Sequence, residues 1–264
     1  MPTGAVDRQA ERAELHRLCV DRLGAYAGPR FAAMARPGFR LEPADDDGAS
    51  ADRCWLGGPA LLEPGTPWPE CAGIPLSPLA VLDTDLLAPW LGTELPGRPG
   101  LLNFFVFAPE LPYEAVRHVR LDDPVSWRVL PADPARAVPV GAPEPAATFP
   151  MARLRAEPVL TLPDQWEYAV DALDFGPDEP DRIPALEVGP VVEAWAERVG
   201  ARHQAFGWPA LESTTPIVPA GEAYTCLLKV LDHPGNPPVV YFTIPTEALR
   251  AGDLARARVT YETF

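Results

Sequence analysis

The chain has 264 residues, enough for one large domain or two small ones with a substantial core. The chain has 35 prolines, well above the average proline content of proteins, which is about 5%. Because each proline lacks a backbone N–H donor, this content disfavours long helices and central strands. The formal net charge of −15 disfavours nucleic acid and anionic membranes as ligands and would attract a basic protein or peptide partner; the alternative is that the charge only confers solubility. A small molecule is the other partner considered.

Residues 1–35 are predicted to form an N-terminal helical segment. Within it, apolar residues recur at helical spacing over residues 7–26, and Gly24 and Gly28 are expected to end the helix. Charged residues precede any apolar run, so no signal peptide is expected and the cytoplasm is the expected location. The longest strongly apolar stretch, residues 101–108, is far shorter than the roughly 20 residues that span a bilayer.

Short elements are expected along the rest of the chain. An acidic turn at residues 45–48 resembles half a calcium loop, but it lacks the later ligands and is interpreted as a solvated loop. The predicted strands are residues 38–42, 79–83, 100–107, 116–121, 125–130, 224–232, 239–244 and 256–264. The predicted helices after the first are residues 85–91, a helix that Pro190 opens and Gly200 ends, and residues 246–251.

Three short segments recur in the same order in the two halves of the chain. They pair residues 57–61 with 207–211, 79–83 with 228–232, and 104–107 with 241–244. This order predicts an internal duplication, with pseudo-repeat halves at approximately 50–130 and 200–264 and a variable acidic insert at 131–200. The expected fold class is α+β: two pseudo-repeated, mostly antiparallel β units with short helices packed around a shared core.

The same segments carry a family resemblance. In the first half they are residues 55–59, 64–69, 75–77, 79–83 and 100–107; in the second half they are His203, residues 207–209, 228–232, 241–242 and 253–264. On these residues the chain resembles the YwqG-like family, a bacterial family of unknown function. The resemblance implies a YwqG-like domain at residues 36–264, an α+β fold and a cytoplasmic protein, and it implies no reaction. Val81 and Val230 stand where relatives often have glutamine, which puts any binding by those glutamines in doubt here.

No catalytic or cofactor motif is recognised. The serine hydrolase, phosphate-binding loop, zinc protease and dinucleotide patterns are absent from the sequence, so no cofactor is expected and enzyme activity stays an open question. The four cysteines, Cys19, Cys54, Cys71 and Cys226, have neither metal-ligand spacing nor the context of a disulfide framework. They are interpreted as reduced, buried thiols, and no metal site is expected.

Five residues are the candidate ligand-binding set: Trp55, Trp68, His203, Trp208 and Glu212. The tryptophans lie at or near the two glycine-proline turns, where they either anchor the edge of a core or form a binding surface. His203 precedes the second turn with Glu212 nearby, which is typical of a polar loop that lines a pocket. The alternative is a histidine that is hydrogen-bonded to the backbone beside a turn.

Three functions remain open from the sequence. The first is a non-catalytic module that binds a protein or a ligand, with an immunity-like or toxin-associated role conceivable only by analogy with relatives. The second is a small-molecule enzyme of a specialised bacterial pathway that uses His203 as an acid–base group. The third is a regulatory or structural subunit.

Overall fold

The computed structural model describes residues 8–44, 53–92, 95, 100–179, 181–200, 202–212, 217–218, 221–232 and 239–262. The predicted acidic turn at residues 45–48 lies outside these described residues. Within them, no helix combines the length and the apolar character that a membrane span requires.

A ten-stranded sheet forms the centre of the molecule, with the order β14-β13-β12-β11-β1-β10-β2-β6-β7-β8 and antiparallel pairing throughout. Its strands are β1 (Arg36–Pro43), β2 (Trp55–Leu56), β6 (Ser77–Asp83), β7 (Leu101–Val106), β8 (Trp127–Ala132), β10 (Ala152–Thr161), β11 (His203–Ala205), β12 (Tyr224–Leu231), β13 (Val239–Pro245) and β14 (Arg258–Glu262). Two small sheets pair β3 (Ala60–Leu62) with β9 (Val138–Val140), and β4 (Glu70–Cys71) with β5 (Ile74–Pro75).

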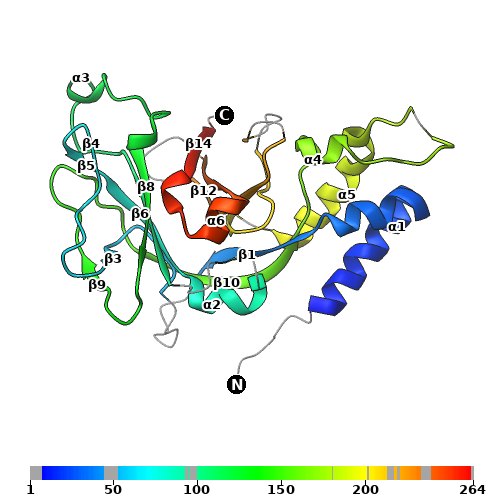
Figure 1. Ribbon diagram of the computed structural model, residues 1–264, viewed down its shortest axis with the longest axis horizontal. Helices are drawn as coiled ribbons and strands as arrows, with labels where there is room; N and C mark the ends of the chain where they lie inside the picture. Colours follow the sequence, from blue (N-terminus) through cyan, green and yellow to red (C-terminus); the bar gives the residue numbers. More distant parts are fainter. Residues whose placement is uncertain are drawn as a thin grey trace.

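The large sheet curves until it is nearly closed, as Figure 1 shows for the strands that run from β8 through β10 and β1 to β12 and β14. The two end strands approach each other. The indole Nε1 of Trp127, at the start of β8, donates to the carbonyl of Ala257, just before β14, at 2.9 Å. The curvature gives the sheet an enclosed inner face and an outer face that other segments cover. The α+β class and the mostly antiparallel pairing are as the sequence predicts.

Helices lie around the curved sheet. They are α1 (Arg8–Ala33), α2 (Thr84–Leu91), α3 (Tyr113–Val116), α4 (Tyr168–Asp171), α5 (Pro184–Val199) and α6 (Thr246–Ala251), with 3₁₀ turns at Pro124–Ser126 and Leu254–Arg256. Helices α1 and α5 lie side by side at one end of the β1–β10 pair (Figure 1). The indole Nε1 of Trp195 on α5 donates to the carbonyl of Leu160 on β10 at 2.7 Å, which fixes α5 to the sheet.

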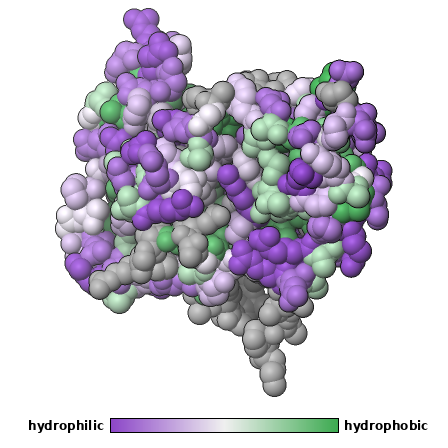
Figure 2. Space-filling model, turned by 45° about the vertical axis from the view of Figure 1, so that its right-hand side comes forward, coloured by the Kyte–Doolittle hydropathy of each residue, from purple (hydrophilic) through white to green (hydrophobic). Residues whose placement is uncertain are grey.

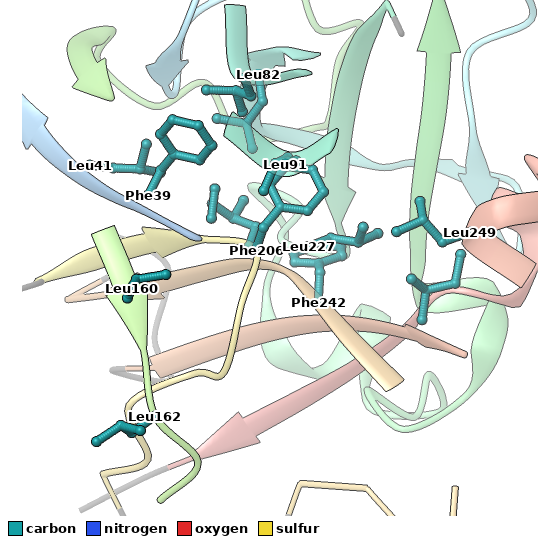
Figure 3. Close-up of a cluster of buried hydrophobic side chains, with 14 of the residues drawn as sticks. Phe39, Leu41, Leu82, Leu91, Leu160, Leu162, Phe206, Leu227, Phe242 and Leu249 are labelled. Atoms are coloured by element: carbon teal, nitrogen blue, oxygen red, sulfur yellow. The ribbon is translucent and has the colours of Figure 1, made fainter. Parts of the chain in front are cut away.

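The inner face of the sheet holds the main apolar core, in which strands from both ends of the order meet (Figure 3). Phe104 of β7 and Phe242 of β13 are fully buried, and their rings stack edge to face with centroids 5.0 Å apart. Phe39 of β1 lies in the same cluster, and Leu249 brings α6 into it. This core is shared by the two halves of the sheet, so neither half buries its apolar face alone.

The strand order is palindromic about the central β1–β10 pair. On one side, β2, β6, β7 and β8 follow one another; on the other side, β11, β12, β13 and β14 do. Strands β6 and β12 each carry an irregularity in register, between Pro78 and Ala80 and between Cys226 and Leu228. The internal duplication predicted from the sequence stays a prediction, which this order is consistent with.

The four predicted helices correspond to α1, α2, α5 and α6, with errors at several ends, and the short helices α3 and α4 were missed. The first helix does not end at residue 26; it runs to Ala33 with a kink at Gly24, whose φ of 79° interrupts the helical backbone. Pro190 does not open the later helix, which begins six residues earlier at Pro184 and keeps Pro190 inside. Pro184 takes the first helical position, where a missing N–H costs nothing and the fixed φ suits the helix.

Among the strands, the prediction at residues 116–121 was wrong, because α3 ends there and turns follow. Strands β10 and β11 were missed, as were the short strands β2, β3, β4, β5 and β9. Pro158 within β10 argued against a strand, yet β10 is central and pairs with β1, more than 100 residues away in sequence. Strand β11 has only three residues, too few for a periodic pattern.

Truncation of Phe242 to alanine tests the shared core. The Phe242→Ala substitution is expected to lower the free energy of unfolding by about 3–5 kcal/mol, because it leaves a cavity against Phe104. Urea denaturation measures the change, and Tyr113→Ala, at a side chain that is 73% exposed, is the control expected to change it by less than about 0.5 kcal/mol. A loss below about 1 kcal/mol at Phe242 would contradict a core common to both halves of the sheet.

Candidate functional site

A cavity of about 530 Å³ lies between helix α5 and the sheet. Val192, Glu193 and Trp195 face it from α5, and Gln204 and Lys229 face it from β11 and β12. Residues 207–212, here named the covering segment, lie along one side, with residues 208–212 in the wall. The size suits a small organic molecule, since ligand cavities typically measure about 300–1,000 Å³.

The covering segment is held against the sheet by polar contacts at its start. Gly207 has a φ of 73°, and a Cβ there would meet Oγ1 of Thr161 at 2.4 Å, so only glycine fits. The next residue, Trp208, donates its backbone N–H to the same Oγ1 at 2.7 Å. The Gln204 amide donates to the carbonyls of Phe206 and Trp208 and accepts from the backbone N–H of Ala210. The glycine-proline turn that begins at Gly207 therefore fixes the position of this wall of the cavity.

Lys229 is the only lysine of the chain, and its side chain is 1% exposed. It stands in β12 between apolar neighbours, in the run Leu227 to Leu231, and its ammonium forms an ion pair with the Glu212 carboxylate of the covering segment. A buried charge costs several kcal/mol of desolvation, which an ion pair repays only in part. The site therefore contains a charged group that the fold would not require for stability.

Carboxylates gather around this ammonium. Burial raises the pKa of the Asp164 carboxyl, and the charges of Glu262 and Glu212 raise it further against the lowering by Lys229 and by the backbone N–H of Trp166. The Tyr241 hydroxyl donates to Glu262 at 2.9 Å and accepts the backbone N–H of Glu212 at 3.2 Å. This network links β13, β14 and the covering segment behind Lys229.

His203 lies apart from the cavity. It is adjacent to Gln204 on β11, and neighbouring residues of a strand point to opposite faces of a sheet. The Nδ1 atom of His203 accepts the backbone N–H of Leu231 at 3.2 Å, which is the backbone-bonded alternative left open by the sequence. Burial, aided by the charges of Arg202 and Lys229, lowers the pKa of His203 to about 4.

The five candidate residues do not form one group. Trp208 and Glu212 line the cavity, although the indole of Trp208 is buried, with its Nε1 donating to the carbonyl of Met34 at 2.7 Å. Trp55 and Trp68 belong to the other half of the chain: Trp55, on β2, donates to the carbonyl of Pro59, and Trp68, just before β4, donates to that of Leu76. Both tryptophans thus anchor turns.

The residues that sequence reasoning missed are Lys229, Asp164 and Gln204. A signal existed for Lys229, because a single charged residue interrupts the apolar run from Leu227 to Leu231 in a chain whose other basic residues, histidine apart, are arginines. Asp164 lies in the segment predicted as a variable acidic insert, and nothing local distinguishes it from the aspartates that follow. Gln204 could not be recognised as a site residue, because strand β11, which points its side chain toward the cavity, was not predicted.

Two further cavities are less suited to a ligand. One of about 440 Å³ lies near Arg36, Thr225 and α6, and one of about 800 Å³ lies where the ends of β7 and β8 approach α6. Among the residues that the structure describes, neither cavity has a fully buried charged side chain in its wall. Within the described residues, no group of three or more histidine, cysteine or acidic side chains is placed to hold a metal ion.

The comparison with family models gives one match, over residues 55–262, to a family described as a domain of unknown function (DUF1963). The match covers the strands from β2 to β14 and includes every residue of the cavity wall. No curated protein matches the chain.

The lowered pKa of His203 predicts how stability depends on pH. Its ordinary pKa is 6.5 and its folded value about 4, so the unfolded chain binds the extra proton between these values and stability falls as pH drops through that window. The expected loss from pH 7.5 to pH 4 is about 3 kcal/mol from this residue. Urea denaturation at several pH values measures it, and His203→Asn is expected to remove this part of the pH dependence. An identical pH dependence in wild type and variant would contradict a buried, neutral His203.

Proposed function

The chain belongs to the DUF1963 family, a domain of unknown function, and we propose that it is a ligand-binding module whose small-molecule ligand occupies the cavity between α5 and the sheet. The observation that carries the proposal is the buried ammonium of Lys229 in the wall of that cavity. A fold that needed only stability would place an apolar side chain at this position, as the other half of the sheet does.

The strand register shows which residues of the two halves occupy corresponding positions. On one side of the central pair, Trp55, Val81 and Asn103 are successive cross-strand partners; on the other side, the partners are Gln204, Lys229 and Tyr241. In the first row, β3 covers the strands and Asn103 accepts the backbone N–H of Leu61 at 2.7 Å. In the second row, Tyr241 accepts the backbone N–H of Glu212, also from a covering segment. Val81 and Lys229 thus occupy corresponding positions, but Val81 is covered by apolar packing, whereas Lys229 borders a cavity.

We also propose the internal duplication, which this correspondence supports with a shift of one residue from the sequence match: Val81 corresponds to Lys229 instead of Val230, and Phe104 to Phe242 instead of Tyr241. The YwqG-like assignment, which we propose for the region from residue 36 onward, rests on the sequence resemblance alone. The two covering segments follow the matched turns at Gly57 and Gly207, both with positive φ, 63° and 73°. The palindromic strand order and the contact between Phe104 and Phe242 fit two units related by a pseudo-twofold axis.

The walls of the cavity indicate the chemistry of the ligand. Leu162, Val192 and Trp195 offer an apolar surface for the body of a small molecule. Three acidic residues, Asp164, Glu193 and Glu212, share the wall with one lysine, so an anionic ligand is disfavoured. The proposed ligand is neutral or cationic and has an apolar or aromatic body. The enzyme hypothesis based on His203 gains no support, because that side chain lies on the other face and donates nothing into the cavity.

Three probes with one aromatic body test the proposal: 2-phenylethylamine, 2-phenylethanol and phenylacetate, which are cationic, neutral and anionic. Isothermal calorimetry is expected to give roughly millimolar binding for the amine and the alcohol, as befits such small ligands, and weaker binding for phenylacetate. Ala196→Phe, which fills the cavity from α5, is expected to abolish binding, whereas Ala115→Phe on the exposed face of α3 retains it. Tightest binding by phenylacetate, or unchanged binding in Ala196→Phe, would contradict the proposal.

A second candidate function is the docking of a basic protein partner, for which a surface near α4 and α5 provides the observation. Trp166, Tyr168, Ile183 and Leu186 are exposed there beside a run of acidic residues, and Figure 2 turns this side forward, where apolar patches interrupt a hydrophilic surface. A labelled peptide of alternating arginine and leucine is expected to bind at low salt and dissociate as salt rises. Leu186→Ser is expected to weaken binding, and Leu121→Ser, on a distant exposed turn, is not. No binding at low ionic strength would contradict this function.

A further inference from the structure

The position of Lys229 carries an inference beyond binding. The chain has 22 basic residues, lysine and arginine together, and Lys229 is the single lysine among them. Its side chain is among the largest that are fully buried, and it borders the cavity. An arginine would supply the same charge to Glu212, but a guanidinium is always protonated, whereas an ammonium can release its proton and become a nucleophile. The one amine side chain of the protein therefore stands where a ligand would meet it.

We propose that Lys229 forms a Schiff base with a small aldehyde or ketone that enters the cavity. This rests on the proposed ligand-binding function and specifies its ligand as a carbonyl compound with an apolar body. The apolar wall of Leu162, Val192 and Trp195 holds that body, and the carbonyl carbon lies against the amine. A neutral carbonyl group also meets no repulsion from the carboxylates of the wall.

The side chains around Lys229 supply the proton transfers that the step needs. The Glu212 carboxylate, already hydrogen-bonded to the ammonium, takes its proton. The freed nitrogen attacks the carbonyl carbon: the C–N bond forms, the C=O π bond breaks, and a proton moves from nitrogen to oxygen to give the carbinolamine. The Asp164 carboxyl then protonates the departing hydroxyl, so that the C–O bond breaks, water leaves, and the C=N bond of a protonated imine forms. No electron donor or acceptor is consumed.

The environments of the two acids fit these roles. Burial raises the pKa of Asp164, which favours its acid form, while Glu212, whose side chain is 32% exposed, is the ion-pair partner of the ammonium. Two carboxyl groups in unlike environments in the wall around one reactive group are typical of acid–base chemistry. The alternative is that the ammonium only holds the covering segment in place through Glu212, and this alternative predicts an unreactive lysine.

Reductive trapping tests the proposal on the full chain. Phenylacetaldehyde and sodium cyanoborohydride are added to the folded protein, and peptide mapping by mass spectrometry locates the stable secondary amine. The expected result is that Lys229 is modified roughly 10²-fold faster than the side-chain amine of Nα-acetyl-lysine under the same conditions, because acid–base groups contribute at least that factor. Modification of Lys229 only after unfolding, or no faster than in Nα-acetyl-lysine, overturns the proposal. The N-terminal amine is mapped separately as an internal reference.

Variants and a competitor make the result specific. Lys229→Arg keeps the charge and is expected to lose the adduct, and its thermal unfolding checks that it folds. Glu212→Gln and Asp164→Asn are expected to slow trapping at least about tenfold, whereas Glu247→Gln, at an exposed pair with Arg256, leaves the rate unchanged. Trapping at the wild-type rate in both Glu212→Gln and Asp164→Asn overturns the proposed proton transfers.

The same experiment separates this inference from the proposed function. 2-Phenylethanol has the aromatic body but no carbonyl group, so it is expected to bind the cavity and slow the trapping of Lys229. If it binds and Lys229 stays unmodified, the Schiff base is wrong and the ligand-binding function stands. If it neither binds nor protects Lys229, the ligand-binding function fails, and the inference fails with it.

Discussion

The antiparallel pairing of β1 with β10 is the interaction on which the rest of the structure depends. Eight residue pairs, from Arg36 with Thr161 to Pro43 with Leu154, join the two strands along their length. Each strand carries one half of the sheet on its other edge, β11 beside β1 and β2 beside β10. Without this pair the two halves would be separate five-stranded sheets, each with an apolar face in water.

The curvature that follows from this pairing separates two environments. The inner face collects the large apolar side chains of both halves, with Phe104 and Phe242 in contact at the middle. The outer face is covered by local segments, and the two halves use it differently. In the first half, Leu61 packs over Trp55 and Val81. In the second half, the covering segment leaves room beside Lys229, and α5 completes the wall. The stability of the fold thus rests on one face and the candidate chemistry on the other.

Much of the fold could be predicted from the sequence because local patterns specify it. Strands such as β7 and β13 are apolar apart from Asn103 and Thr243, and the glycines at 57 and 207 mark turns that need a positive φ. Strand β10 could not be recognised, because it contains a proline and owes its place to β1, which is remote in sequence. Side chains along β11 point alternately to the two faces of the sheet, so Gln204 faces the cavity and its neighbour His203 does not. The sequence brought Trp208 and Glu212 into the candidate set but could not separate them from Trp55 and Trp68, which lie in the other half.

The central claim is that a ligand meets Lys229 inside the cavity, and nuclear magnetic resonance of the protein labelled with ¹⁵N-lysine tests it most directly. One lysine gives one side-chain ammonium signal, so no assignment is needed. Addition of 2-phenylethanol is expected to shift this signal in a saturable way, and the shift is expected to vanish in Ala196→Phe. A signal that stays in place while 2-phenylethanol saturates another part of the protein would contradict the account.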